Sequence, residues 1–301
     1  MDRHNDRSVQ CGLGHCRKSR WTSRVALAVF LLLCLPQCWG EAPLVVGIFP
    51  RESATTTHDK FAALGRYLGN VLRREVRVET GRDFGGFWQA IAEQRYDLVH
   101  FNQYHYVRSH AQFGYRVIAK NEERGKATIA PAVAVRADSG IASVAALRGR
   151  HIIFGGGSSA MVAYVGVKAL LKQAGLQESD YTTETAINPP SALVAVYMGQ
   201  APAAGIGENA LDLPTVVRRI DASKIRILAK GEEIPQLPWA LRGSVDGALV
   251  RQIRAALMDL GQTVEGREIL REVGVTGFVG AEDREFDICR RLILDVLGEK
   301  Y

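Results

Sequence analysis

The pattern of apolar and polar residues predicts short buried strands interleaved with amphipathic helices. Residues 44–49 form an apolar run of strand length, and residues 56–74 place apolar side chains at helical spacing. A second strand (75–79), a short helix (84–94) and a third strand (97–101) are expected to follow, joined by short loops. This alternation is typical of a parallel sheet covered by helices.

The most informative stretch is 150–175, which passes from an apolar strand (151–154) through glycines and serines into a helical pattern. The connecting run is Gly155-Gly156-Gly157-Ser158-Ser159. One of the two serines is expected to cap the helix, and Gly175 to follow its last turn. Unpaired backbone N–H groups and the positive end of the helix dipole favour anions at such a start, so the stretch predicts an anion-binding loop.

Two similar segments flank the central part of the chain. Residues 118–123 contain Ala-Lys-Asn-Glu-Glu and lead to a proline-bearing strand, and residues 228–233 contain Ala-Lys-Gly-Glu-Glu and lead to another. Paired crossings at these points would make a hinge between two α/β lobes, and the alternative is chance similarity between charged turns. Further strands are predicted at 117–120, 130–136, 181–185, 203–206 and 237–242, and further helices at 190–198, 247–260, 264–272 and 281–297.

The first 40 residues predict a secretory signal peptide. A basic segment ending at Arg24 precedes an apolar run of 11 residues (25–35), and cleavage is expected after Gly40. The run is too short to span a membrane, although a retained membrane anchor is the alternative.

Charge and cysteine content change once the leader is set aside. The predicted leader holds six of the 38 Lys and Arg residues and two of the 32 Asp and Glu residues. The rest of the chain therefore has 32 basic and 30 acidic residues and a net charge of +2. This balance gives no reason to expect a nucleic-acid partner. Of the five cysteines only Cys289 lies outside the leader, so no internal disulfide is expected, and its position on an apolar helical face predicts a core residue.

Several short segments, taken together in their order and spacing, resemble those of a known family. They are Asp83-Phe84-Gly85-Gly86, Asp97-Leu98-Val99-His100-Phe101-Asn102, and the stretches 154–160, 191–200 and 234–239. With them, nearly all of the chain after the leader resembles the periplasmic phosphonate/phosphite/phosphate-binding proteins of ABC transporters, the PhnD-like group of type II solute-binding proteins.

The resemblance implies a two-lobed periplasmic-binding-protein fold that captures a small oxyanion between its lobes and is not an enzyme. The expected division is a signal peptide (1–40), lobe 1 (41–121), lobe 2 (122–231) and a return to lobe 1 (232–301). We expect a periplasmic monomer without cofactor or metal. Its partner is expected to be an inner-membrane ABC permease, and the alternative is a sensory subunit that presents its ligand to a membrane histidine kinase.

The resemblance also implies where the ligand binds. It places Gly157, Ser158, Ser159 and Ala160 around the oxyanion, and Glu208 where an acidic residue can meet an amino group of the ligand. Phe84 and Phe101 stand where the family often has tyrosines. Asn188-Pro189 stands near a family histidine, and Gln236 near a second acid.

The residues themselves add two candidates. Asn102 and Tyr104 follow the end of the third strand, and open α/β sheets bind ligands at the carboxyl ends of their strands. His105 is the alternative to Tyr104 as the ligand contact, and helix capping or hinge packing is the alternative role for this segment. The predicted ligand-binding residues are therefore Phe84, Phe101, Asn102, Tyr104, Gly157, Ser158, Ser159, Ala160 and Glu208.

Other motifs in the chain favour other functions more weakly. Gly155, Gly157 and Ala160 satisfy the dinucleotide pattern G-x-G-x-x-A, with Glu184 as the ribose-binding acid. The same loop approaches a hydrolase nucleophile elbow, but no histidine follows His151 to complete a triad. His100, His105 and His110 recur every five residues, a spacing that turns the side chains of a helix apart and disfavours a metal site.

Overall fold

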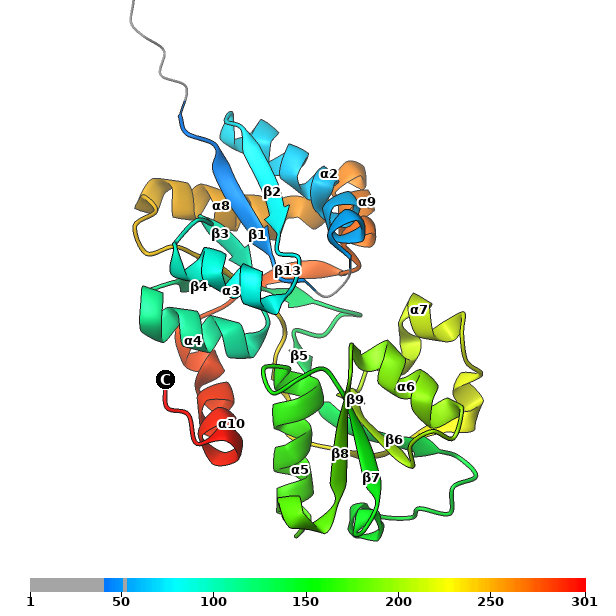
Figure 1. The fold of residues 1–301 in the computed structure, drawn as a ribbon. Helices are drawn as coiled ribbons and strands as arrows, with labels where there is room; N and C mark the ends of the chain where they lie inside the picture. Colours follow the sequence, from blue (N-terminus) through cyan, green and yellow to red (C-terminus); the bar gives the residue numbers. More distant parts are fainter. Residues whose placement is uncertain (1–40, 51–52) are drawn as a thin grey trace, which may run out of the picture. The chain divides into compact units, whose positions relative to one another are not determined.

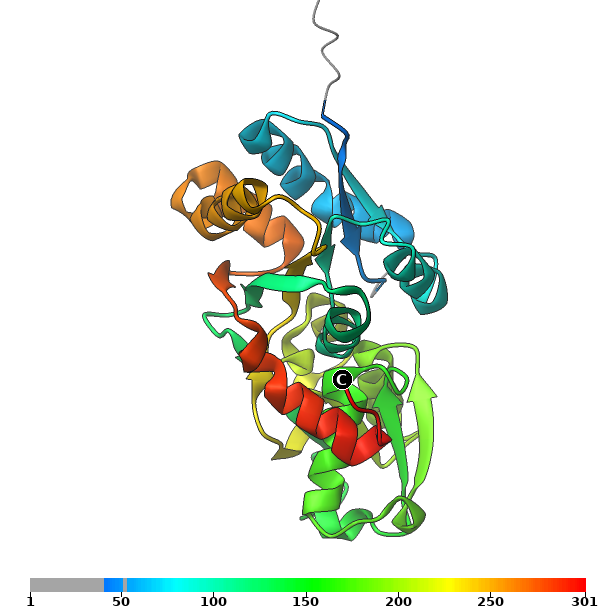
Figure 2. The same cartoon turned by 90° about the vertical axis from the view of Figure 1, so that its left-hand side faces the viewer.

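The computed structural model describes residues 41–50 and 53–301, apart from the side chain of Phe84, and its helices and strands build two mixed sheets (Figures 1 and 2). The predicted signal peptide lies outside the described residues. None of the described helices is long and apolar enough to cross a membrane.

The first sheet combines segments from both ends of the chain. Its elements are β1 (Leu44–Ile48), α2 (Ala54–Leu72), β2 (Val76–Thr80), α3 (Phe84–Ala92), β3 (Leu98–His100), α4 (Gln103–Phe113), β4 (Arg116–Glu122), β12 (Pro238–Leu241), α8 (Gly247–Asp259), η6 (Leu260–Gln262), α9 (Val264–Val273) and β13 (Gly277–Gly280). The strand order is β13-β4-β12-β3-β1-β2. The first three strands of the chain are parallel, as their interleaved helices predict, so their carboxyl ends share one edge.

The second sheet is built from the middle of the chain. Its elements are β6 (Pro131–Arg136), η1 (Val144–Leu147), β7 (His151–Gly155), η2 (Met161–Gly166), α5 (Val167–Gln173), η3 (Glu178–Asp180), β8 (Thr182–Ala186), α6 (Pro189–Tyr197), β9 (Ala203–Gly207), η4 (Ala210–Asp212), α7 (Pro214–Val217), η5 (Ala222–Lys224) and β10 (Ile225–Lys230). The order is β10-β6-β9-β7-β8, and β7 is parallel to both of its neighbours. The loops that follow β7, β8 and β9 therefore lie at one edge.

Two chain crossings connect the sheets and pair with each other. β5 (Thr128–Ile129) lies between β4 and β6, and β11 (Ile234–Pro235) lies between β10 and β12. They form an antiparallel two-stranded ladder in which Ile129 faces Ile234. The predicted fold of two α/β lobes joined by a two-strand hinge is confirmed.

The sequence pattern did not predict α7 or β13, and two further elements also differ from the prediction. α4 was not expected, because its residues 103–107 are all buried and show no polar stripe of the kind that marks an amphipathic helix. The last helix, α10 (Asp287–Leu297), was expected to start at 281. Instead, the 3₁₀ turn η7 (Asp283–Phe286) precedes it, and a capping box formed by Glu282 and Glu285 sets the start of η7.

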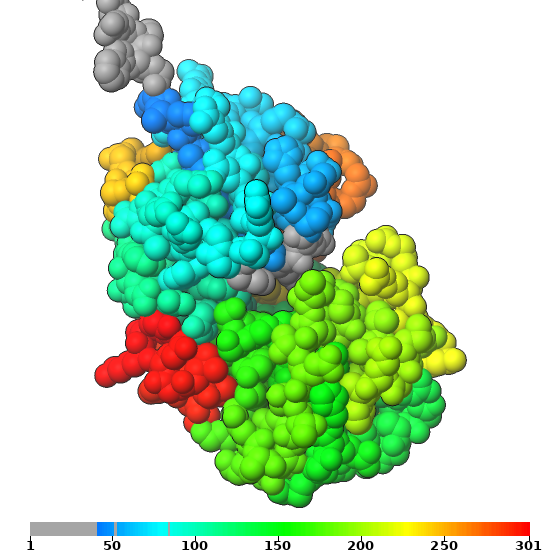
Figure 3. Space-filling model, in the orientation of Figure 1, coloured from blue at the N-terminus to red at the C-terminus, as the bar shows by residue number. Residues whose placement is uncertain are grey.

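α10 packs against elements that belong to both sheets. Its buried residues Cys289, Leu292 and Ile293 share one apolar cluster with Val107 of α4 and Val165 of η2. Figures 1 and 3 show the C-terminal helix (red) beside α4 (teal) and α5 (green). Lys172 of α5 donates to Asp295 of α10 at 2.5 Å. Full burial of Cys289 confirms its prediction as a core residue.

Candidate functional site

The glycines of the loop after β7 have different structural roles. A Cβ added to Gly155 would lie 2.5 Å from Cα of Pro189. Gly156 has a φ of +127°, and a Cβ added to it would lie 2.8 Å from Cβ of Ala160. The fold therefore requires glycine at these two positions. Gly157 has neither constraint, because no atom lies within 4 Å of an added Cβ and its φ is outside the left-handed region. The missing side chain at Gly157 leaves open space in front of the loop.

The loop also presents backbone donors. The Ala160 N–H donates to the Gly157 carbonyl at 2.8 Å, which closes a turn. Within residues 41–50 and 53–301, no protein acceptor is found for the backbone N–H groups of Gly157, Ser158, Ser159 or Met161. These donors precede a continuous helical segment, η2 followed by α5, so the dipole of that segment adds to their positive potential.

The prediction that Ser158 or Ser159 caps the helix is wrong. The N-cap position falls on Ala160, and no side chain caps it. The helix begins as a π-helix, in which the Tyr164 and Val165 N–H groups both donate to the Ala160 carbonyl, at 2.9 and 3.2 Å. Because the turn at 157–160 ends before the helix begins, both serines stay in the loop, and no serine hydroxyl is used to satisfy the first turn. π-turns of this kind are frequent at functional sites.

Asn102 connects the loop to α4. Its side-chain Nδ2 donates to the Ser159 carbonyl at 2.9 Å, and its Oδ1 accepts from the His105 N–H at 2.8 Å, which caps α4. The side chain is nearly buried. The structure thus brings together two predicted site segments that are 57 residues apart in the sequence.

Tyr104 lies against the end of the chain. Its hydroxyl donates to Oε2 of Glu299 at 2.7 Å, and its ring meets that of Tyr301 edge to face. Burial and the hydrogen bonds with Tyr301 and Glu299 raise the pKa of the Tyr104 phenol, so it stays protonated at neutral pH. Its predicted contact with a ligand stays a prediction.

The two phenylalanines of the predicted site lie on neighbouring elements. Phe101 is fully buried and packs against Phe87, Tyr106 and Tyr115. Because its ring is part of the core, we do not include it in the site proposed below. Phe84 is the first residue of α3, which Asp83 caps, and its side chain lies outside the described structure.

Glu208 follows β9 at the same sheet edge as the loop. Partial burial works to raise the pKa of its carboxyl, but Lys230 and the backbone N–H of Ala130 outweigh this effect and hold the pKa below its ordinary value. The partner Lys230 was not predicted. The only signal for it in the sequence is the repeated Ala-Lys-x-Glu-Glu segment, whose other lysine, Lys120, pairs with Glu285.

The alternative motifs find little support in the geometry. Glu184 lies within β8 and contacts His151 Nε2 at 3.2 Å, so it is not placed beyond a strand end, where a ribose would lie. In the part of the chain that the structure describes, no three His, Cys, Asp or Glu side chains gather to hold a metal ion.

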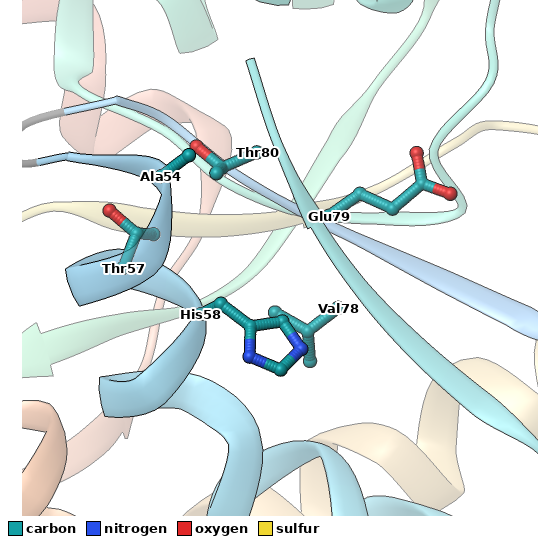
Figure 4. A pocket seen from close by; sticks show the side chains of 6 residues that line it. All are labelled: Ala54, Thr57, His58, Val78, Glu79 and Thr80. Atoms are coloured by element: carbon teal, nitrogen blue, oxygen red, sulfur yellow. The ribbon is translucent and has the colours of Figure 1, made fainter. Parts of the chain in front are cut away.

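A small pocket of 190 Å³ lies between the start of α2 and the end of β2 (Figure 4). It is lined by Ala54, Thr57, His58, Val78, Glu79 and Thr80. None of the predicted ligand-binding residues lines it, so it is separate from the loop at 157–160.

Comparison with known proteins agrees with this fold. A family model described as "ABC transporter, phosphonate, periplasmic substrate-binding protein" matches residues 46–286. Among solved structures, PhnD1 from Prochlorococcus marinus in complex with methylphosphonate has a TM-score of 0.75 at 15% identity, covering 85% of this chain and 99% of its own. A binding protein component of an ABC phosphonate transporter from Pseudomonas aeruginosa has a TM-score of 0.73 at 14% identity, and the match covers 85% of this chain and 86% of its own.

A protein from Xanthomonas citri bound to ATP is also similar, with a TM-score of 0.70 at 16% identity and 86% and 98% of the two chains covered. At these identities the structures share the fold. The family model, in contrast, spans most of the chain, and its members bind solutes rather than catalyse reactions. The chain therefore belongs to the family of periplasmic substrate-binding proteins of phosphonate ABC transporters.

Proposed function

We propose that the protein captures a small phosphorus oxyanion at the loop Gly157–Ala160 for uptake by an ABC transporter. The observation that carries this proposal is Gly157. It is the glycine of the loop that the fold does not require, and it borders backbone N–H groups that have no acceptor among the described residues. A side chain there would enter open space beside the loop.

The chemistry of the loop suits a phosphoryl or phosphonyl group. Backbone N–H groups and serine hydroxyls replace the water around the oxygens, and the helix dipole offsets part of the charge. Ser158 is exposed and Ser159 partly so, which leaves both hydroxyls accessible. The ligands named for two similar proteins, methylphosphonate and ATP, both present oxygens on phosphorus. That shared group supports the proposal without choosing between ligands.

The site would form from both lobes. Asn102 holds the Ser159 carbonyl from the end of β3, so closure of the two lobes and ordering of the loop are coupled. On the basis of the family description, we propose that the closed form delivers its ligand to an inner-membrane ABC permease.

A ligand screen tests the proposal. Thermal unfolding would be followed with phosphate, phosphite, methylphosphonate, 2-aminoethylphosphonate and sulfate, in buffer free of phosphate. A ligand at 100 times its Kd stabilises a protein by about 2.7 kcal/mol, which gives a clear rise in Tm. We expect a selective rise with at least one phosphorus oxyanion. No rise with any of them would show that the proposed ligand class is wrong.

A matched pair of variants locates the site. Gly157→Val is expected to keep the wild-type Tm but lose the shift, because its side chain enters space that is open in the free protein. Gly247→Val adds the same side chain at the exposed start of α8, where only the end of the Arg251 side chain is near. This variant should keep both the wild-type Tm and the ligand-induced rise in Tm. If Gly157→Val still binds with unchanged affinity, the loop is not the site.

The transport role has its own test. Uptake of the identified ligand into vesicles that contain the cognate permease should depend on the added protein. If the ligand-bound protein instead changes only the phosphorylation of a membrane histidine kinase, the sensory function is correct.

A further inference from the structure

Both carboxylate oxygens of Glu208 are already used within the protein. Oε2 accepts from the Lys230 ammonium at 2.6 Å, and Oε1 accepts from the Ala130 N–H at 3.3 Å. The backbone N–H of Glu208 also donates to the Ala130 carbonyl at 2.9 Å. The Glu208 side chain is 12% exposed, whereas that of Lys230 is 52% exposed. A half-exposed cation therefore covers a nearly buried anion.

The residue before Glu208 lies close to the helix that follows the proposed oxyanion loop. A Cβ on Gly207, the residue before Glu208, would lie 3.3 Å from Cγ1 of Val162 in the first turn of η2. Farther along the chain, Asn209 Nδ2 donates to Glu123 Oε2 at 2.8 Å. The two polar residues after β9 are thus both bound to side chains of the protein.

We propose that Lys230 occupies the place where Glu208 would otherwise receive a ligand's ammonium group, so that the protein selects phosphorus oxyanions that carry no such group. The proposal rests on the proposed function and refines its ligand class. It follows from charge balance, because a carboxylate already paired with one ammonium gains little from a second. An incoming cation must also displace Lys230 or approach it against like-charge repulsion.

Lys230 can be displaced without breaking the fold, because its side chain is half exposed and β10 is held by its backbone pairing with β6. Lys230→Met keeps the apolar length of the side chain and removes the charge. It leaves Oε2 of Glu208 without its hydrogen-bond donor. The variant should then accept an ammonium that the wild type rejects.

The test compares two ligands that share a phosphonate group and differ in the ammonium. Calorimetry would give Kd values for methylphosphonate and 2-aminoethylphosphonate with the wild-type chain, Lys230→Met and Lys230→Met/Glu208→Gln. We expect the wild type to prefer methylphosphonate, and Lys230→Met to shift the ratio of the two Kd values by about tenfold toward the aminophosphonate, the effect of one charged hydrogen bond. The double variant should lose that gain, because the gain requires the carboxylate.

Lys224→Met is the matched control. It removes the same charge at the other end of β10, about 20 Å away at about 3.3 Å a residue, and should leave the ratio unchanged.

Each other outcome has a definite meaning. If the wild type prefers 2-aminoethylphosphonate, or if the ratio stays constant in Lys230→Met while methylphosphonate still binds, Lys230 does not set the ligand class and the inference is wrong. If neither phosphonate nor the other oxyanions bind the wild type, the proposed function itself fails, and this inference fails with it. Should Lys230→Met not fold, Lys230→Gln with the same ligand pair decides between these outcomes.

Discussion

The side-chain amide of Asn102 donates to the backbone carbonyl of Ser159 across 2.9 Å, while its oxygen caps α4. One residue therefore performs two tasks, and two substitutions separate them. Asn102→Asp keeps an oxygen for the cap but loses the donor and adds a negative charge beside the loop. Asn102→Ala removes both.

We expect Asn102→Asp to keep the cap of α4, since Asp and Asn are equally good caps, but to lose stability because a nearly buried carboxylate then faces the Ser159 carbonyl. Its affinity for the oxyanion should fall by about fivefold or more, because like charges a few ångströms apart repel by about 1 kcal/mol or more. Asn102→Ala should lose about 1 kcal/mol of stability from the cap alone. Urea unfolding and calorimetry measure the two effects. Wild-type affinity in Asn102→Asp would show that Asn102 does not border the ligand.

Substitution by alanine should lower the stability of the protein at Gly155 but not at Gly157. Gly155→Ala places a Cβ 2.5 Å from the backbone of Pro189, which cannot move aside as a flexible side chain can. We expect a loss of about 1–3 kcal/mol, typical of overpacking. Gly157→Ala should change stability little. Equal Tm values for the two variants would contradict the steric argument.

His105 should make stability fall in mild acid. Burial, with a smaller contribution from Arg108, lowers its pKa to about 4. Because the ordinary pKa is about 6.5, the unfolded chain binds a proton between these values that the folded chain does not. The stability due to neutral His105 is therefore complete above pH 6.5 and is lost as the pH falls toward 4.

The comparison of wild type with His105→Gln isolates this effect from the carboxylates that also titrate in acid. Between pH 7 and pH 4.5 the wild type should lose about 2 kcal/mol more unfolding free energy than the variant, which has no ring to protonate. Urea denaturation at the two pH values measures the difference. Parallel losses in both proteins would show that His105 titrates normally.

Cys289 should be inert in the native protein. It is fully buried on α10, and burial raises the pKa of its thiol, so the reactive thiolate is not formed at neutral pH. After removal of the leader, a thiol reagent should give no rapid reaction in buffer and one equivalent in guanidinium chloride. Rapid labelling of the folded protein would mean that α10 opens readily.

The sequence predicted the elements whose pattern is local and periodic. Helices α8 and α9 and the strand that leads into the glycine loop follow from apolar spacing, and the hinge crossings from a repeated segment. α4 could not be found in this way, since both its sides are covered, one by Trp88 and the other by the C-terminal residues. Because the first five residues of α4 are all buried, no polar stripe marks this helix in the sequence.

The parts of the site that were not predicted depend on contacts between segments that are far apart in the sequence. The segment after Ser159 has the composition of a capped α-helix, but it begins as a π-helix. There, Gly166 packs against Pro131 and Gly205 lies close to the Ala163 carbonyl. The pairing of Lys230 with Glu208 depends on β6 lying between β9 and β10. Neither packing nor strand order can be read from spacing along the chain.

The prolines at the two crossings determine how the lobes can move. Pro131 begins β6, Pro235 ends β11 and Pro238 begins β12, so three φ angles are fixed and the residue before each proline is held extended. The β5–β11 ladder removes further freedom. The remaining backbone torsions lie mainly in residues 123–127 and 231–233, between the strands. We therefore expect the connection to allow a narrower range of opening orientations than an unpaired linker without proline would allow.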